Sequence, residues 1–264
     1  PVELLDLSGR KGLVIGIANE RSLAWPAALH FRQAGAELAI TYVNERTKTH
    51  VTPLAARLEA PIVLPCDVKA PQELDAVFDA IAERWGKLDF ILHAIGSVPP
   101  ADLHGRLTDC SAAGFSEAMA VSVHSLIRMA HLSEPLMTDG GSVITLSYLG
   151  GERVVENYNV MGPVKAALEA TVRYLAHELG PSNIRVNAIS AGAMRTLSLA
   201  GIRGGKSLMG TGRDWSLLKE DTRMEGVAGA ALYLLSDLGH SVAGEVHHVD
   251  AGFHVVGVPD LPED

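Results

Sequence analysis

Short apolar runs alternate with amphipathic stretches along most of this chain. The apolar runs predict strands at 11–16, 37–43, 62–64, 88–94, 142–146 and 184–189, and a further strand-like run spans 244–249. Between them, apolar residues recur at helical spacing, which predicts helices at 46–58, 71–85, 115–136, 159–179 and 225–235. We expect the helix at 115–136 to pack in the core through Met119, Val123, Ile127 and Ala130. Strands that alternate with helices are typical of an α/β protein whose sheet is mostly parallel, with ligands bound at the carboxyl ends of the strands.

The first strand runs through the loop GIANERSLAW into a helix that ends near Gly35, which is how a dinucleotide-binding βαβ unit begins. The loop lacks GxGxxG, but its small residues still allow a cofactor to approach Gly16. We expect Ser22 to cap the helix and Pro26 to lie in its first turn. An ordinary strand-to-helix turn remains open. Together with the alternation, the loop predicts a Rossmann-type, doubly wound fold in one domain, residues 1–264.

Other candidate cofactor positions follow the next strands. The second strand leads into Val43-Asn44-Glu45-Arg46, where the nearest cation lies three residues beyond the strand; this favours NADH without excluding NADPH. Asp67 can accept a hydrogen bond from an adenine amino group or, alternatively, cap the next helix. Gly96 can let the backbone approach a cofactor, or it can serve a turn.

The stretch LSYLGGERVVENYNVMGPVK, residues 146–165, carries the candidate chemistry. Tyr158 precedes Lys165 by about two helical turns, so the two side chains would share nearly one helix face. A phenol beside a fixed cation can hold or protonate a developing oxyanion. A helix that begins at about Val160 would leave Pro163 harmless in its first turn, whereas an earlier start predicts a kink.

Residues 194–215 combine five glycines with several apolar side chains. A flexible apolar segment at the ligand-facing edge of a sheet predicts a substrate lid. An irregular excursion without such a role is the alternative.

Composition narrows the class of protein. The chain is 47% hydrophobic and 20% charged, and it lacks both a signal-peptide pattern and an apolar run of the roughly 20 residues that span a bilayer. Two isolated cysteines, Cys66 and Cys110, suit a reducing cytoplasm. A net charge of -9 argues against nonspecific nucleic-acid binding. The 11 histidines show no metal-site spacing, and we expect structural roles for His247 and His248.

With these motifs in view, the chain resembles the bacterial enoyl-[acyl-carrier-protein] reductases of the short-chain dehydrogenase/reductase superfamily. The resemblance covers residues 5–253 and is most specific in SYLGGERVVENYNVMGPVKAALEA and IRVNAISAGAMRT. Ordinary members of the superfamily carry TGxxxGxG, NAG and Tyr-x3-Lys motifs, which are absent here. Tyr158 and Lys165 instead show the six-residue gap typical of the enoyl reductases. Ala94 departs from many relatives, which have serine there.

The resemblance implies that hydride from NADH reduces a trans-2-enoyl thioester to the saturated thioester in type II fatty-acid synthesis. It implies that Tyr158 donates to the thioester oxygen, that Lys165 holds the nicotinamide ribose, and that Tyr148 lines the acyl pocket. Met161 and Leu199 are further expected substrate contacts. The expected cofactor contacts are Gly16, Ser22, Leu23, Asp67, Val68, Gly96, Lys165, Met194 and Thr196.

The resemblance also implies a homotetramer that receives an acidic acyl carrier protein. Arg203 and Lys206 match places where the family tends to be basic, although simple solvation of both charges is an open alternative. Two other functions compete with enoyl reduction. A carbonyl reductase of the same superfamily would use the shorter tyrosine–lysine spacing, and a non-catalytic NAD-responsive binding protein would need neither residue.

Overall fold

The seven strands pair side by side in the order β3-β2-β1-β4-β5-β6-β7, and every pair is parallel. The structure is a computed structural model that describes residues 5–194, 196 and 205–258. The strands are β1 Lys11–Ile15, β2 Glu37–Tyr42, β3 Ile62–Pro65, β4 Phe90–His93, β5 Gly141–Ser147, β6 Ile184–Ala191 and β7 Val246–Val249. Strand order reverses between β1 and β4, which is where doubly wound sheets open a ligand crevice. The predicted Rossmann-type α/β fold is confirmed.

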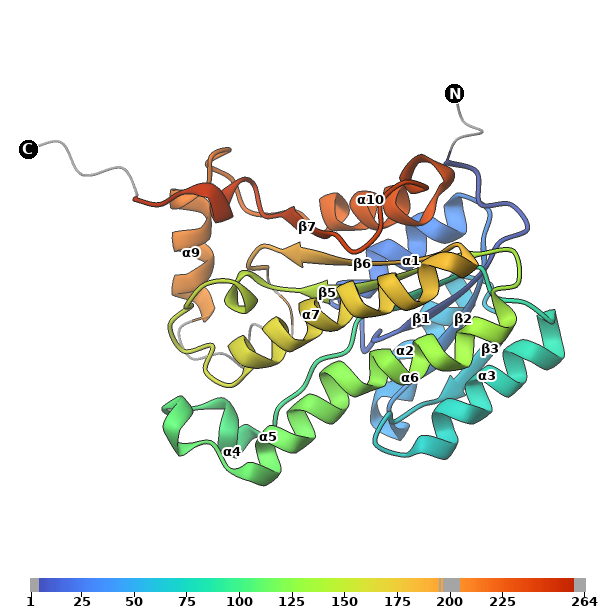
Figure 1. Cartoon of the computed structure of the whole chain (residues 1–264), viewed down its shortest axis with the longest axis horizontal. Coiled ribbons are helices and arrows are strands. Elements are labelled where there is room, and N and C mark those ends of the chain that lie inside the picture. The colour runs from blue at the N-terminus through green and yellow to red at the C-terminus, as the bar shows by residue number, and fades with distance from the viewer. Residues whose placement is uncertain (1–4, 195, 197–204, 259–264) are drawn as a thin grey trace, which may run out of the picture.

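Helices cover both faces of the sheet (Figure 1). Buried residues of α3, α6 and α7 form one apolar cluster with the strands, and those of α1, α2 and α10 form the other. α9 stands apart, at the end of the sheet where β5, β6 and β7 terminate. The helices are α1 Ala24–Gln33, α2 Glu45–Arg57, α3 Pro71–Trp85, α4 Pro100–Leu103, α5 Ala112–Met119, α6 Ser125–Ser133, α7 Met161–Leu179, α9 Gly205–Trp215 and α10 Met224–Leu235.

The helix expected at 115–136 begins earlier and contains a π-helical turn, Ala120–His124, between α5 and α6. A π turn adds one residue to the i→i−4 pattern, so the buried face shifts after it. Leu126 and Met129 are fully buried as a result, whereas Ile127 is 40% exposed. The expectation that Ile127 packs in the core is therefore wrong.

α7 begins at Met161, which makes Pro163 its third residue. The N–H of a first-turn residue has no partner within the helix, so a proline there removes no hydrogen bond. This is the harmless placement expected for a helix that starts near Val160. In the same way, Pro26 lies in the first turn of α1, as predicted.

Candidate active site

Two strand ends meet closely at the point where the strand order reverses. Gly16 follows β1 with φ of 118°, and a Cβ on it would lie only 2.1 Å from the carbonyl oxygen of Ala94, which follows β4. Both the backbone conformation and the contact require glycine. The ends of β1 and β4 therefore present bare backbone to the crevice in which sheets of this type bind dinucleotides.

α7 places a buried lysine at the same edge of the sheet. Lys165 is 8% exposed, and its Nζ donates a hydrogen bond to the carbonyl oxygen of Leu146, 2.7 Å away. A Cβ built on Gly96 would lie 3.6 Å from that Nζ and 3.8 Å from Cε of Met161, so these three residues are neighbours. Burial lowers the pKa of Lys165 to about 8, against an opposing effect of Glu169.

Tyr158 lies in a tight turn before α7, between Asn157 and Asn159, whose φ values are 63° and 48°. Its ring contacts that of Tyr148 edge-on, with centroids 4.9 Å apart. Gly150 leaves room for this ring, because a Cβ there would lie 2.2 Å from Cδ1 of Tyr158. The expectation that Tyr158 and Lys165 share one helix face is wrong, since the two left-handed asparagines hold Tyr158 in a turn and the helix starts after it.

The hydroxyl of Tyr158 belongs to a neutral phenol. The side chain is 7% exposed, and burial raises its pKa above the ordinary value, with further contributions from Tyr148 and Glu169. Burial, followed by the charge of Asp250, raises the pKa of Tyr148 to about 12. Both tyrosines therefore keep their protons near neutral pH and act as hydrogen-bond donors.

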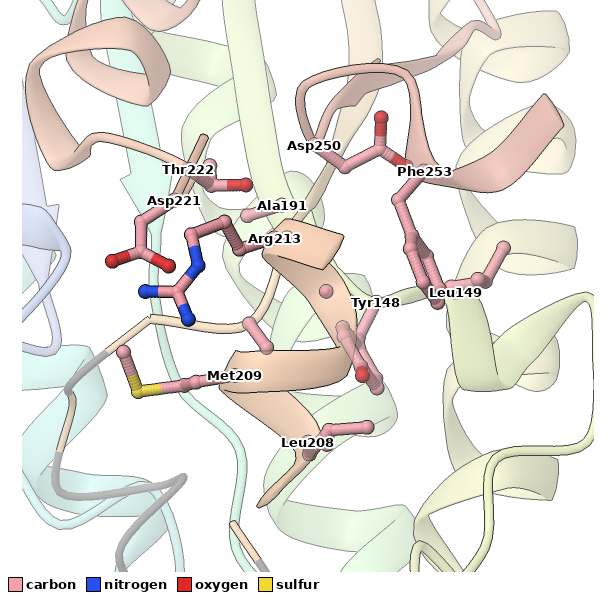
Figure 2. A pocket seen from close by; sticks show the side chains of 13 residues that line it. Tyr148, Leu149, Ala191, Leu208, Met209, Arg213, Asp221, Thr222, Asp250 and Phe253 are labelled. Atoms are coloured by element: carbon pink, nitrogen blue, oxygen red, sulfur yellow. The ribbon is translucent and has the colours of Figure 1, made fainter. Parts of the chain in front are cut away.

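Tyr148 also lines a pocket closed on one side by α9 (Figure 2). Leu149 and Phe253 contribute apolar surface from the loops that follow β5 and β7, and Leu208 and Met209 contribute it from α9. A mostly apolar pocket with a few polar groups is typical of small-molecule sites. The charged or polar side chains that line it are Arg213, Asp221, Thr222 and Asp250.

Ser22 ties the loop after β1 together but does not cap α1. Its Oγ accepts hydrogen bonds from the N–H groups of Ala18 and Asn19, at 2.9 and 3.2 Å. α1 begins only at Ala24, and Leu23 occupies the cap position without a side-chain hydrogen bond. The capping role expected for Ser22 is wrong because its hydroxyl accepts from N–H groups of the preceding loop and the helix starts two residues later.

Asp67 does not cap α3 either. Ala70 holds the cap position and Pro71 begins the helix, whereas the Asp67 carboxylate accepts a hydrogen bond from the N–H of Lys69 at 2.9 Å. Of the two roles open for Asp67, the capping role is wrong. Val68 packs against the apolar cluster on the α7 side of the sheet.

The remaining predicted residues follow β6. Met194 is buried, and the N–H of Thr196 donates to its carbonyl oxygen at 2.7 Å. Leu199 and Arg203 lie outside the described residues. Lys206 belongs to α9, but its side chain is also outside the described part of the chain.

A buried histidine joins two strand ends to the helix layer. The His93 ring lies 2.8 Å from Thr145 Oγ1 on β5 and 2.8 Å from Ser125 Oγ on α6. Complete burial lowers the pKa of His93 to about 3, so the ring stays neutral. Its contacts fix the end of β4, directly before Ala94 and Gly96.

Two residues at the site escaped the sequence analysis. Ser122, fully buried in the π turn, accepts a hydrogen bond from the Ser97 N–H at 3.2 Å and so supports the backbone next to Gly96. No sequence pattern marks a π turn. Asp250 follows β7 and accepts from the N–H groups of Gly252 and His254. The rule that singled out Asp67, an acid at the carboxyl end of a strand, also applies to Asp250.

The other histidines near the pocket are held by carboxylates. His248 Nε2 lies 2.7 Å from Oε1 of Glu152, and the His248 ring stacks on that of His254 with ring centroids 3.9 Å apart. Nδ1 of His254 in turn lies 2.9 Å from Oδ1 of Asp250. Within the described residues, no cluster of three or more His, Cys, Asp or Glu side chains has the geometry of a metal site. None of the helices described is both long and apolar enough to cross a membrane.

Comparison with known proteins adds sequence and structural relatives. A family model described as enoyl-(acyl carrier protein) reductase matches residues 16–254. The chain is 47% identical over 255 residues to enoyl-[acyl-carrier-protein] reductase [NADH] 2 of Rhizobium meliloti (strain 1021), covering 97% of this chain and 95% of that protein.

Two solved structures share the fold closely. An enoyl-(acyl-carrier-protein) reductase from Anaplasma phagocytophilum in complex with NAD has a TM-score of 0.93 and 48% identity, with 98% of each chain covered. A Bacillus cereus enoyl-acyl carrier protein reductase with NADP+ and indole naphthyridinone has a TM-score of 0.93 and 45% identity, covering 96% of this chain and 99% of that one.

Proposed function

The chain belongs to the enoyl-(acyl carrier protein) reductase family, and we propose that Tyr158, Lys165 and Tyr148 carry out the family's reaction in it. The protein is an NADH-dependent oxidoreductase that reduces the double bond of an enoyl thioester carried on acyl carrier protein, in fatty-acid synthesis. The observation that carries the assignment of residues is the placement of a buried neutral phenol, Tyr158, at the same sheet edge as a buried cation, Lys165.

The residues at the strand-order reversal fit a nicotinamide dinucleotide. Gly16 and Gly96 leave the backbone open to its phosphates and ribose, and Asp67 and Val68 lie after β3, on the side expected for adenine. The ammonium group of Lys165 has three N–H donors, and the Leu146 carbonyl occupies one of them, which leaves donors for ribose hydroxyls. When bound, the cofactor supplies the hydride. Ser22, Leu23, Met194 and Thr196 complete the proposed set.

Tyr158 acts on the substrate oxygen. As hydride reaches the β-carbon, negative charge develops on the thioester oxygen, and a phenol O–H aimed at that oxygen stabilises the charge. A donor whose interaction strengthens only as charge appears lowers the barrier without tightening substrate binding. Tyr148 holds the Tyr158 ring by their edge-on contact, and the positive charge of Lys165 favours the anionic oxygen nearby.

The acyl chain lies in the pocket beside Tyr148, with Met161 and Leu199 as further contacts. Residues 194–215 act as a lid on the one catalytic domain, and the position of α9 across the pocket supports this role. Arg203 and Lys206 receive the acidic carrier protein. A local basic patch is needed there, because the chain as a whole carries -9 and its partner is also acidic.

The protein works as a homotetramer in the cytoplasm. Exposed apolar side chains on α5, α6 and α7, namely Phe115, Ile127 and Tyr174, support association of copies along these helices. Light scattering after size exclusion tests this. A mass near four times the 28.0 kDa chain is expected, and a monomer at micromolar concentration contradicts it.

Substrate choice tests the function against its rivals. We expect crotonyl thioester to oxidise NADH, followed at the nicotinamide absorbance, and acetoacetyl thioester to leave it unchanged. The reverse preference would identify a carbonyl reductase. NADH binding without turnover on either thioester would identify a binding protein.

A further inference from the structure

One helical turn beyond Lys165, α7 carries a buried acid that the proposed reaction does not use. Glu169 is 4% exposed, and its Oε1 accepts a hydrogen bond from the hydroxyl of Ser147 at 2.5 Å. Ser147 is the last residue of β5 and directly precedes Tyr148. The carboxyl group of Glu169 therefore joins the helix that carries Lys165 to the strand end that carries Tyr148.

The turn after Tyr148 packs on the same carboxyl group. A Cβ on Gly151 would lie 2.8 Å from Oε1 of Glu169 and 3.1 Å from the backbone nitrogen of Ala166. The 3-10 turn Leu149–Gly151 thus fits against α7 only because residue 151 has no side chain. Three elements enclose Glu169, and its side chain has little freedom to move away from Lys165.

Charged or polar groups face Glu169 from its own helix, from β5, from the loop after the 3-10 turn and from β7. Burial raises the pKa of Glu169, and Glu152 of the neighbouring loop adds to this, whereas Ser147, Arg173 on α7 and His248 on β7 lower it. The Glu169 charge raises the pKa of Lys165 against the effect of burial. It also raises the pKa of Tyr158.

We propose that Glu169 is a positioning residue that serves as the buried counter-charge of Lys165 and keeps this lysine protonated for cofactor binding. The negative charge of Glu169, one helical turn away, favours the charged form of Lys165 even without direct contact. The inference rests on the proposed role of Lys165 in holding the cofactor, and it assigns the protonation of that lysine to a residue on the next turn of the helix.

The substitution Glu169→Gln tests the proposal because it keeps an oxygen acceptor for Ser147 and removes the charge. The readout is the NMR titration of 13C-labelled lysine, with the Lys165 signal identified by its loss in Lys165→Met. We expect the midpoint of Lys165 to fall by roughly half to one pH unit relative to wild type. This readout needs neither substrate nor turnover, so its failure is distinct from failure of the enoyl reductase function.

NADH binding provides the second readout. In Glu169→Gln, the pH at which affinity begins to fall should move down with the lysine midpoint, while affinity at pH 6.5 stays within about twofold of wild type. Glu178→Gln is the matched control, since Glu178 is exposed on the same helix, and it should move neither quantity. An unchanged Lys165 midpoint, or a loss of affinity that is equal at every pH, overturns the proposal.

Ser147→Ala keeps the inference testable if the glutamine variant does not fold. The Ser147 hydrogen bond holds the pKa of Glu169 down, so its removal should leave Glu169 less charged and move the Lys165 midpoint in the same direction by a smaller amount. A shift of the midpoint to higher pH contradicts the proposed coupling.

Discussion

The ammonium group of Lys165 donates to the carbonyl oxygen of Leu146 across 2.7 Å, in the interior beside the strand ends. Burial disfavours the charged form of the lysine and lowers its pKa to about 8. A buried charge of this kind does not stabilise the fold. Its position between β5 and Gly96 instead suits a group that must meet an anionic ligand at the sheet edge.

Removing the buried charge of Lys165 together with that of its counter-charge, Glu169, should stabilise the fold and weaken NADH binding. The folded-state pKa of Lys165 lies below that of the unfolded chain, so the penalty for burying the charge is fully present below about pH 8 and fades as pH rises further. We expect the double variant Lys165→Met/Glu169→Gln, which leaves neither charge buried alone, to raise the free energy of unfolding at pH 7 by roughly 1 to 3 kcal/mol. Urea unfolding followed by circular dichroism measures this.

The same variant should bind NADH at least about tenfold more weakly, because it lacks the donors for the ribose. Fluorescence titration with NADH gives the dissociation constant. A variant that is less stable than wild type and binds NADH normally would show that the lysine is structural.

NADH affinity of the wild-type protein should depend on pH through Lys165. The free protein loses the lysine charge as pH rises through about 8, and loss of that charge removes an attraction for the anionic cofactor. We expect the dissociation constant to be level below this pH and to rise above it, by at most about tenfold per pH unit. Titrations between pH 6.5 and 9.5 test this, and an equally steep rise in Lys165→Met would assign the dependence to another group.

A methyl group on Gly16 should distort the backbone at the cofactor crevice between the ends of β1 and β4. Its Cβ would lie 2.1 Å from the Ala94 carbonyl oxygen, and its φ of 118° is unfavourable for alanine. We expect Gly16→Ala to destabilise the fold by about 1 to 3 kcal/mol and to weaken NADH binding at least about tenfold.

Gly229 supplies the matched control for that substitution. It lies inside α10, and a Cβ there meets nothing within 4 Å, so Gly229→Ala should be neutral or stabilise the protein by up to about 1 kcal/mol. NADH binding equal to wild type in Gly16→Ala would contradict the close approach of cofactor to this loop.

The sequence predicted the strands well because most of them are short, mainly apolar runs with a polar or glycine-containing end. Gly16, Asp67 and Gly96 follow β1, β3 and β4, so a parallel sheet necessarily brings them to one edge. Asp250 follows β7 and reaches the same edge for the same reason, so its position after a strand was also predictable.

Details of helix ends were beyond the sequence pattern. Ile127 fits an uninterrupted helical period, but the π turn before it shifts the buried face of the helix. The residue types in Ala120–His124 do not predict a π turn. Tyr158 and Lys165 have a spacing that suits one helix, yet Asn157 and Asn159 adopt left-handed conformations, and the Asn159 side chain donates to the carbonyl oxygen of Leu103, far away in the sequence. Local periodicity does not contain that tertiary information.

The most direct test of the account is single-turnover reduction by Tyr158→Phe with NADH already bound. The phenylalanine ring preserves the contact with Tyr148 and removes only the hydroxyl, so the NADH dissociation constant should stay within about twofold of wild type. We expect the rate of NADH oxidation on rapid mixing with crotonyl thioester to fall by about 100-fold or more, since one donor to the developing oxyanion is lost. A rate equal to wild type would show that Tyr158 is not the donor.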